Sequence, residues 1–270
     1  MLRKIALGTA LVLAGLPAVA QDSDLGAAVQ NPISSLVSLP FKYTFDNGAP
    51  NGDANTLSVN PVYPVSVGNW NFVNRALIPI ANAPGGITLP SNPSIGEVGD
   101  GGRSFGLGDI NYSLYLNPKE TTGKWIWGVG PSFTLPTATD DSLGSGKWSG
   151  GATAIALTQP EWGTYGVLVR QLWSFAGDSD RADVNQGLVE AFVNYNLDDG
   201  WYLLTDSVAT INWEAGSDKL TLPIGGGAGR VFRMGKQPVN ARVEAYYNVL
   251  RPDTAPEWTL GATFQFLFPK

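Results

Sequence analysis

Alternation of apolar and polar residues with a period of two runs through most of this 270-residue chain and constrains its fold more than any other feature. The clearest case is Val239–Val249, where Val, Ala and Tyr alternate with Asn, Arg and Glu. The segment Leu260–Phe268 repeats the pattern with Phe264, Phe266 and Phe268 on one face. Because successive side chains of a strand point to opposite faces, these segments predict strands whose two faces meet different environments.

The same pattern predicts an all-β fold of twelve strands. Most of them are about 8 to 13 residues long, whereas strands in soluble sheets usually have about five or six. Tilted strands that cross a bilayer need about 9 to 11 residues. We predict strands at Leu39–Asp46, Thr56–Val67, Trp70–Ile80, Phe105–Asn117, Lys124–Leu135, Ala152–Thr158, Tyr165–Phe175, Gly187–Leu197, Trp201–Trp213, Lys219–Gly229, Pro238–Val249 and Trp258–Phe268.

The connections between these strands alternate in length. Gly68-Asn69, Pro118–Gly123, Gln159–Gly163, Asp198–Gly200 and Arg230–Gln237 are mostly compact. The remaining connections, such as those at 81–104, 136–151 and 176–186, are mostly longer and more acidic. Short periplasmic turns opposite long outer loops are typical of outer-membrane barrels. The sequence therefore predicts one antiparallel transmembrane β-barrel over residues 39–270.

The nine tryptophans give an independent indication of the same fold. Five lie at or just after the short turns and four lie beside the long loops. Two aromatic girdles at the two membrane interfaces predict this distribution. A soluble β-sandwich would instead place tryptophans in mid-strand.

The first 38 residues do not follow the period of two. Arg3 and Lys4, the apolar stretch Ile5–Leu16 and the small residues Ala18-Val19-Ala20 predict a signal peptide over residues 1–20, so that the mature chain begins at Gln21. Apolar residues then recur at helical spacing, with a capping Asn31-Pro32, and predict a short helical segment within residues 21–38. It could be a lead-in that packs on the barrel rim, which we favour, or a plug that enters the lumen.

Composition excludes several functions. Without the predicted signal peptide the chain holds 15 basic and 23 acidic groups, a net charge of −8, which argues against nucleic acid as a partner. It contains no histidine and no cysteine, so Ser-His-Asp and Cys-His catalysis and His- or Cys-based metal sites are excluded. No carboxylate pair stands out as catalytic. We therefore predict no enzyme activity and no cofactor.

The stretch "DDSLGSGKWSGG" places Gly144, Gly146 and Lys147 together, as in a phosphate-binding loop. The first glycine of that pattern is replaced by Asp141, and Trp148 stands where Ser or Thr should hold magnesium. We instead expect these residues to let the third long loop turn tightly and gate the mouth of the barrel.

Five aspartates crowd this loop and the next one: Asp140, Asp141, Asp178, Asp180 and Asp183. Carboxylates could hold a calcium or magnesium ion, but the glycine and the distal glutamate of a calcium loop are missing. Solvated loop charge is the preferred interpretation, with no bound metal.

If the apolar strand faces meet lipid, the polar faces line the lumen. This predicts a set of lumen residues, namely Asn60, Arg75, Arg170, Glu190, Asn194, Asp206, Arg242 and Glu244. Either these charges pair with one another and stiffen a filled barrel, or some stay free and form a constriction that selects solutes. A twelve-stranded barrel is intermediate between packed eight-stranded and open sixteen-stranded barrels.

Several long stretches resemble a family of Gram-negative outer-membrane β-barrels named for the meta-pathway of phenol degradation. They are "NPISSLVSLPF", "FGLGDINYSLYLNP", "WGVGPSFTLPTATDDSLGSGKWSGG", "QLWSFAGDSDRADVNQ", "GKQPVN" and "PEWTLGATFQFLFPK". The resemblance spans nearly the whole mature chain and implies a transporter or channel for small solutes, aromatic compounds among them. Pro269 and Lys270 after Phe268 depart from the aromatic last residue that outer-membrane barrels usually present to the assembly machinery.

Together these observations predict a narrow, porin-like channel for small organic solutes in the outer membrane of a Gram-negative bacterium, with anions slightly favoured by Arg75 and Arg242. The alternative is a closed structural or interaction barrel without transport activity. The expected partners are outer-membrane lipid, lipopolysaccharide, a small-molecule solute and the barrel assembly machinery.

Overall fold

The computed structural model describes residues 25–87, 89, 102–121 and 123–269. The predicted signal peptide, residues 1–20, lies outside the described residues. Within the described part of the chain, no helix is long and apolar enough to cross a membrane.

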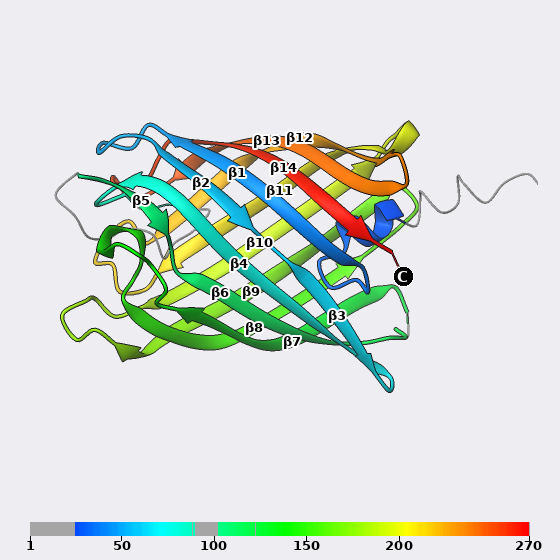
Figure 1. Ribbon diagram of the computed structural model, residues 1–270, viewed down its shortest axis with the longest axis horizontal. Coiled ribbons are helices and arrows are strands. Elements are labelled where there is room, and N and C mark those ends of the chain that lie inside the picture. The colour runs from blue at the N-terminus through cyan, green and yellow to red at the C-terminus, as the bar shows by residue number, and fades with distance from the viewer. Residues whose placement is uncertain (1–24, 88, 90–101, 122, 270) are drawn as a thin grey trace, which may run out of the picture.

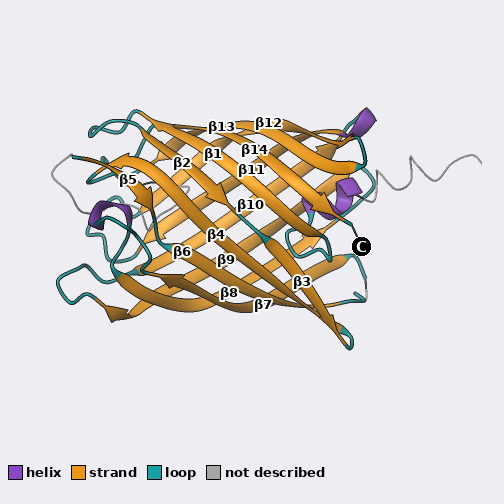
Figure 2. Ribbon diagram, viewed as in Figure 1, coloured by secondary structure: helices purple, strands orange, loops and turns teal. Residues whose placement is uncertain are grey.

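The chain forms a closed antiparallel β-barrel, which confirms the predicted fold class (Figures 1 and 2). The last strand, β14, pairs with β1 in eleven successive residue pairs, from Val37 opposite Phe268 to Asn47 opposite Trp258, and so closes the wall. The strands are β1 Val37–Asn47, β2 Ala54–Val59, β3 Val62–Val67, β4 Trp70–Pro84, β5 Arg103–Leu107, β6 Ile110–Pro118, β7 Trp125–Leu135, β8 Lys147–Thr158, β9 Gly163–Gly177, β10 Asn185–Asn196, β11 Trp201–Asn212, β12 Leu220–Met234, β13 Gln237–Leu250 and β14 Trp258–Phe268.

The fourteen segments make twelve wall strands, as predicted, because two of those strands are interrupted. β2 and β3 are separated at Asn60-Pro61, where proline has no N–H to donate to the ladder. The Asn60 N–H instead donates to the Pro40 carbonyl at 2.9 Å. β5 and β6 are separated at Gly108-Asp109, and both pair with β4.

Two strand boundaries differ from the prediction by five residues, more than most of the others do. β8 begins at Lys147, and β12 continues to Met234, so the predicted turn Arg230–Gln237 shrinks to residues 235–236. The glycines around residue 150 suggested a loop, but they serve close strand packing. A Cβ atom on Gly151 would lie 1.9 Å from the Gln171 carbonyl oxygen of β9.

The outer wall of the barrel carries the large apolar side chains. All nine tryptophans are exposed, by 40 to 53%, together with many Val, Leu and Tyr side chains. At the short-turn end, Trp162 stacks on Tyr165 with ring centroids 5.6 Å apart, and Trp70 lies 6.2 Å from Trp127. An exposed apolar surface of this extent, bounded by aromatic rings, is suited to lipid.

The pairing of β11 with β12 is interrupted in the middle of the wall. Paired residues resume at Thr210 opposite Thr221 after Leu204 opposite Gly227, and the intervening part of β12 contains Pro223. The Asp206 N–H donates instead to the Tyr246 hydroxyl at 2.7 Å, and the Ser207 hydroxyl donates to the Pro223 carbonyl. These bonds satisfy backbone groups at membrane depth and fix the position of Asp206.

The two ends of the barrel differ in form. The compact turns lie at one end, together with the helix at residues 25–30 and the end of β14. The long connections and the 3₁₀ turn η1 (Asp141–Leu143) lie at the other end (Figure 2). We refer to them as the short-turn end and the long-loop end.

Candidate functional site

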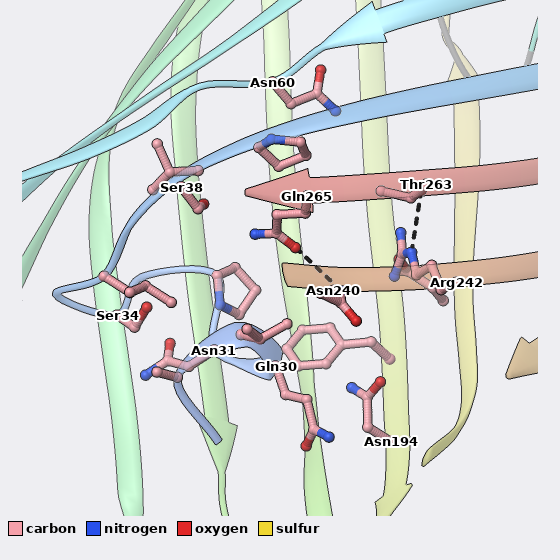
Figure 3. Close-up of a pocket in the computed structure, with 18 of the residues that line it drawn as sticks. Gln30, Asn31, Ser34, Ser38, Asn60, Asn194, Asn240, Arg242, Thr263 and Gln265 are labelled. Carbon is pink, nitrogen blue, oxygen red and sulfur yellow. Dashed lines mark hydrogen bonds and ion pairs between the residues drawn. The ribbon is translucent and has the colours of Figure 1, made fainter. Parts of the chain in front are cut away.

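The inner faces of six wall strands bring seven charged side chains to one level of the lumen, which we call the charged belt. Its members are Lys42 of β1, Arg75 of β4, Arg170 of β9, Glu190 of β10, Asp206 of β11, and Arg242 and Glu244 of β13. Of the eight predicted lumen residues, six belong to the belt. Asn60 and Asn194 line the adjoining space, as Figure 3 shows.

Part of the charged belt is an ion-pair network. Glu244, whose side chain is only 1% exposed, accepts from Lys42 at 2.6 Å and lies 3.6 Å from Arg242. Arg242 also donates to Asp206 at 3.2 Å. The opposing residue on β14 is Gly261, where a Cβ atom would lie 2.7 Å from Glu244 Cγ. Because Gly261 has no side chain, Glu244 can lie across β14 and reach Lys42. The network therefore links β11 and β13 to β1, across the β1–β14 pair that closes the barrel.

Arg75 and Arg170 stand outside this network. The Arg75 guanidinium lies over the Tyr115 ring, 5.9 Å from its centroid. Arg170 donates from Nη1 to Asn111 Oδ1 at 2.9 Å. Among the described residues, no carboxylate lies within ion-pair distance of either guanidinium.

Two cavities meet at the charged belt. The larger, about 230 Å³, extends towards the long-loop end and is lined by Asn111, Ser113, Thr134 and Arg170. The smaller, about 160 Å³, extends towards the short-turn end (Figure 3). Both are lined by Lys42, Asn60, Arg75, Glu190, Asp206 and Arg242, so these side chains surround the passage between them.

Residues 25–36 lie inside the barrel at the short-turn end. Ile33 is fully buried and packs with Val73, Tyr115 and Phe192 of the inner wall. A Cβ atom on Gly128 would lie 3.0 Å from Ile33 Cδ1, so β7 leaves room for this side chain. These contacts favour the lumen plug. The sequence had favoured the other alternative, a lead-in on the barrel rim.

Uncharged hydrogen bonds hold the same segment. Gln30 donates to Asn196 and accepts from the Thr164 hydroxyl, each at 2.8 Å. Gln159 donates to the Ala27 carbonyl at 2.7 Å. Leu25 and Leu36 pack with inner-wall side chains of β11, β12 and β14.

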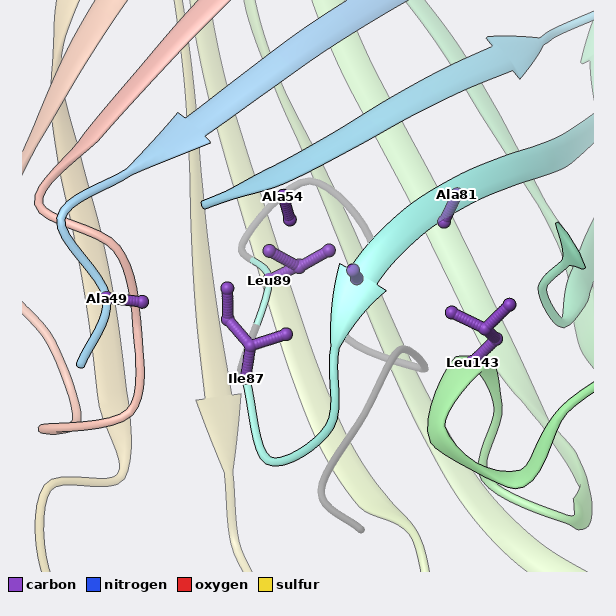
Figure 4. Packing of buried hydrophobic residues seen from close by; sticks show 7 residues of the cluster. Ala49, Ala54, Ala81, Ile87, Leu89 and Leu143 are labelled. Carbon is purple, nitrogen blue, oxygen red and sulfur yellow. The ribbon is translucent and has the colours of Figure 1, made fainter. Parts of the chain in front are cut away.

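An apolar cluster covers the long-loop end (Figure 4). Leu143 of η1 and Ile87 and Leu89 of the second long connection are fully buried against small side chains of β2 and β4. The cluster comprises Ala49, Ala54, Ala81, Ala83, Ile87, Leu89 and Leu143. The alanines leave the space into which the loop side chains dock.

Polar contacts hold the third long loop, residues 136–146, over this cluster. Asp109 accepts from the Ser145 N–H at 2.7 Å and from the Ser145 hydroxyl at 2.8 Å. Arg181 of the next loop donates to the carbonyls of Asp141 and Gly144. Lys147 Nζ lies 3.3 Å from Asp183 Oδ1.

The three residues predicted as a loop gate therefore have separate positions. Gly144 packs against Asp109, where a Cβ atom would lie 2.5 Å from Oδ1. Gly146 has a φ of +69°, a backbone conformation that favours glycine. Lys147 belongs to β8 and is buried, which corrects its assignment to the loop.

Four of the five loop aspartates have partners within the two loops or in the strands that flank them. Asp141 lies 3.8 Å from Arg181 Nη1, and Asp178 accepts from the Asp180 N–H at 2.9 Å. Hydrogen bonds from Ser142 hold the pKa of Asp140 below its usual range, and the bond from Lys147 does the same for the pKa of Asp183. Within the described residues, no three acidic side chains gather as they would around a metal ion.

Sequence reasoning missed Lys42, Asn111, Tyr115 and Asp109. The alternation of Ser38, Pro40 and Lys42 with Leu39 and Phe41 was a sufficient signal for Lys42. Tyr115 and Asn111 lie on the inner face of β6 but carry no charge that would draw attention. Asp109 lies at a strand interruption that the period of two does not reveal.

Comparison with solved structures extends this description. The COG4313 outer membrane channel from Pseudomonas putida F1 superposes with a TM-score of 0.63 over 86% of this chain and 94% of that chain, at 16% identity. This chain has the fold of an outer-membrane barrel. The outer membrane phospholipase A of Escherichia coli resembles this barrel more weakly, with a TM-score of 0.43 at 13% identity over 91% of this chain and 98% of that chain. The Pseudomonas putida toluene transporter TodX has a TM-score of 0.42 at 8% identity over 90% and 93%.

No protein-family model matches the sequence of this barrel, and no curated protein does. The narrower resemblance to the family named for phenol degradation therefore stays a prediction. The COG4313 channel structure confirms the barrel fold and leaves the solute open.

Proposed function

We propose that this outer-membrane barrel is a narrow channel for small organic solutes, with anions slightly favoured. The observation that carries the proposal is that two cavities meet at the charged belt inside the wall. The lumen is covered by residues 25–36 and by loop side chains, which can separate from the wall without breaking its strand ladders. The passage between the cavities is therefore the selective point of the channel.

We assign the anion preference to Arg75 and Arg170, in place of the predicted Arg75 and Arg242. Arg242 is paired with two carboxylates and is better suited to hold the wall together. Among the described residues, Arg75 and Arg170 form no ion pair with a carboxylate, and they line the larger cavity together. A passing anion therefore meets these two guanidinium groups.

The proposed setting is the outer membrane of a Gram-negative bacterium, with the long-loop end outside. Lipid and lipopolysaccharide would contact the aromatic outer wall, and the barrel assembly machinery would insert it. The sequence resemblance suggests aromatic compounds among the solutes. The proposal includes no catalytic activity, because the chain contains no histidine or cysteine.

One observation favours the alternative of a closed structural or interaction barrel. Described side chains cover the lumen at both of its ends. In that case all the belt charges would serve the stability of the wall, and solutes would not cross.

Single-channel conductance in planar bilayers separates the two functions. The chain from Gln21 to Lys270 would be refolded and its heat-dependent gel mobility checked before insertion. Discrete conductance steps with a reversal potential on the anion side are expected from the channel. The anion preference should decline in the double variant Arg75→Gln/Arg170→Gln. It should persist in Arg251→Gln, because Arg251 is a loop residue that pairs with Glu257 at 2.9 Å. A folded barrel that inserts but never conducts would establish the closed barrel.

A further inference from the structure

Arg75 and Arg170 direct two positive charges towards the same inner strand. Their contacts, the Tyr115 ring and Asn111 Oδ1, are four residues apart on the inner face of β6. Arg75 comes from the neighbouring strand β4, whereas Arg170 comes from β9 and reaches β6 past β7 and β8. Both guanidinium groups line the cavity of about 230 Å³.

The charges around this cavity do not balance. The charged belt holds four cations and three carboxylates, and two of those carboxylates are engaged by Lys42 and Arg242. The third, Glu190, shares a hydrogen bond with Asp206 and lies near both arginines, but forms no ion pair with either among the described contacts. Two like charges that share one cavity repel each other, and a bound anion offsets this cost.

The other lining side chains indicate the kind of anion. Asn60, Ser113 and Thr134 can hydrogen-bond near the guanidinium groups, while Leu77, Leu168 and Leu188 provide an apolar wall. The planar guanidinium fork matches a carboxylate in two parallel hydrogen bonds. A ligand with a carboxylate at one end and a hydrocarbon body at the other satisfies both parts of the cavity.

We infer that this cavity is a binding site for a small organic carboxylate, held by Arg75 and Arg170 with its hydrocarbon part against the leucines. The inference rests on the proposed function, because it names the solute class that the channel would hold. An inorganic anion such as phosphate would use the same two arginines but would leave the leucines without a partner.

Equilibrium dialysis of labelled benzoate against the mature protein in detergent tests the site without measuring conduction. Benzoate should bind, and excess unlabelled benzoate should displace it. Benzamide, which has the same body without the charge, should not compete, and phosphate should compete weakly. Arg75→Gln/Arg170→Gln should weaken binding at least tenfold, since it removes both guanidinium groups. Arg230→Gln is the matched control, because that arginine lies outside the lumen over the Trp201 ring at 5.3 Å.

A second variant should change the affinity in the opposite direction. Glu190→Gln removes the negative charge that lies near Arg75 and Arg170 in the same cavity and should tighten benzoate binding a few-fold. A chain that begins at residue 37 is included so that residues 25–36 cannot block access to the cavity. Absence of binding by both the mature and the shortened chain would overturn the inference, as would equal displacement by benzamide. Phosphate competing as well as benzoate would assign an inorganic anion instead.

The outcome for the site is distinct from the outcome for the channel. Conductance without benzoate binding would leave the proposed function intact and remove the inference. Binding without conductance would keep the carboxylate site and make the barrel a closed binding protein.

Discussion

The two ends of the lumen are covered by different kinds of contact. At the short-turn end, Ile33 is buried among apolar side chains and Gln30 bonds only to uncharged partners. At the long-loop end, Leu143 is equally buried, but the loops above it are also held by ion pairs, between Arg181 and Asp141 and between Asp183 and Lys147 of β8. Both covers have an apolar base, and only one depends on ion pairs.

This difference determines how each end responds to its surroundings. Exposed ion pairs weaken with added salt and with acid, whereas hydrogen bonds between amides and hydroxyls respond to neither within the ordinary pH range. Reversible opening by solution conditions is therefore expected at the long-loop end. The short-turn end should open only when the segment itself is removed or pulled away.

Removal of residues 21–36 should have the largest effect. A chain that begins at Val37 keeps every wall strand but loses the buried side chains of Leu25, Ile33 and Leu36, each worth about 1.5 to 3 kcal/mol of docking. We expect its single-channel conductance to rise several-fold, at low and at high salt alike. Unchanged conductance would show that the charged belt, and not this segment, limits the flow.

Replacement of Leu143 should open the other end by a smaller amount. Leu143→Ala removes the fully buried anchor of η1 and should weaken loop docking by about 2 to 5 kcal/mol, with the wall left folded. Hydrogen exchange at residues 141–146 should accelerate, and channel openings should become more frequent. Leu250→Ala is the matched control, because Leu250 ends β13 and is half exposed. If exchange accelerates equally throughout the wall, the loop is part of the barrel fold and not a separable cover.

The wall of the barrel could be predicted because the patterns that specify its strands lie within short stretches of sequence. A period of two and the alternation of short and long connections require no knowledge of what lies across the lumen. The interruption at Asn60-Pro61 was visible as a proline within a predicted strand, but whether the wall breaks there depends on pairing with Pro40.

The arrangement inside the lumen could not be predicted because it depends on closure and register. Lys42 and Glu244 lie near opposite ends of the chain. They meet only because β14 pairs with both β1 and β13 and places Gly261, which has no side chain, opposite Glu244. Similarly, the apolar stripe around Ile33 fits a rim or a lumen equally well. The space that Gly128 leaves for Ile33 favours the lumen. Nothing in the sequence around this glycine indicates that it faces Ile33.

The smallest expected effect tests the ionic part of the long-loop cover. Asp183 accepts from Lys147 Nζ at 3.3 Å and from the Ser174 hydroxyl at 3.1 Å, which lowers its pKa from the ordinary 3.8. A lowered pKa in the docked state stabilises docking above the ordinary value, and this contribution is lost as the pH falls through the lowered pKa. After correction for intrinsic rates, amide exchange at residues 178–184 should therefore accelerate a few-fold on acidification below about pH 4.

Two variants test whether Asp183 causes this acid step. Asp183→Asn should exchange faster at neutral pH and lose the step. Asp180→Asn should keep it, because the Asp180 carboxylate forms no described ion pair. Exchange at residues 25–30 should stay constant over the same range and with added salt. An equal acid response at both ends would mean that the two covers share one ionic cause, and the comparison between them would fail.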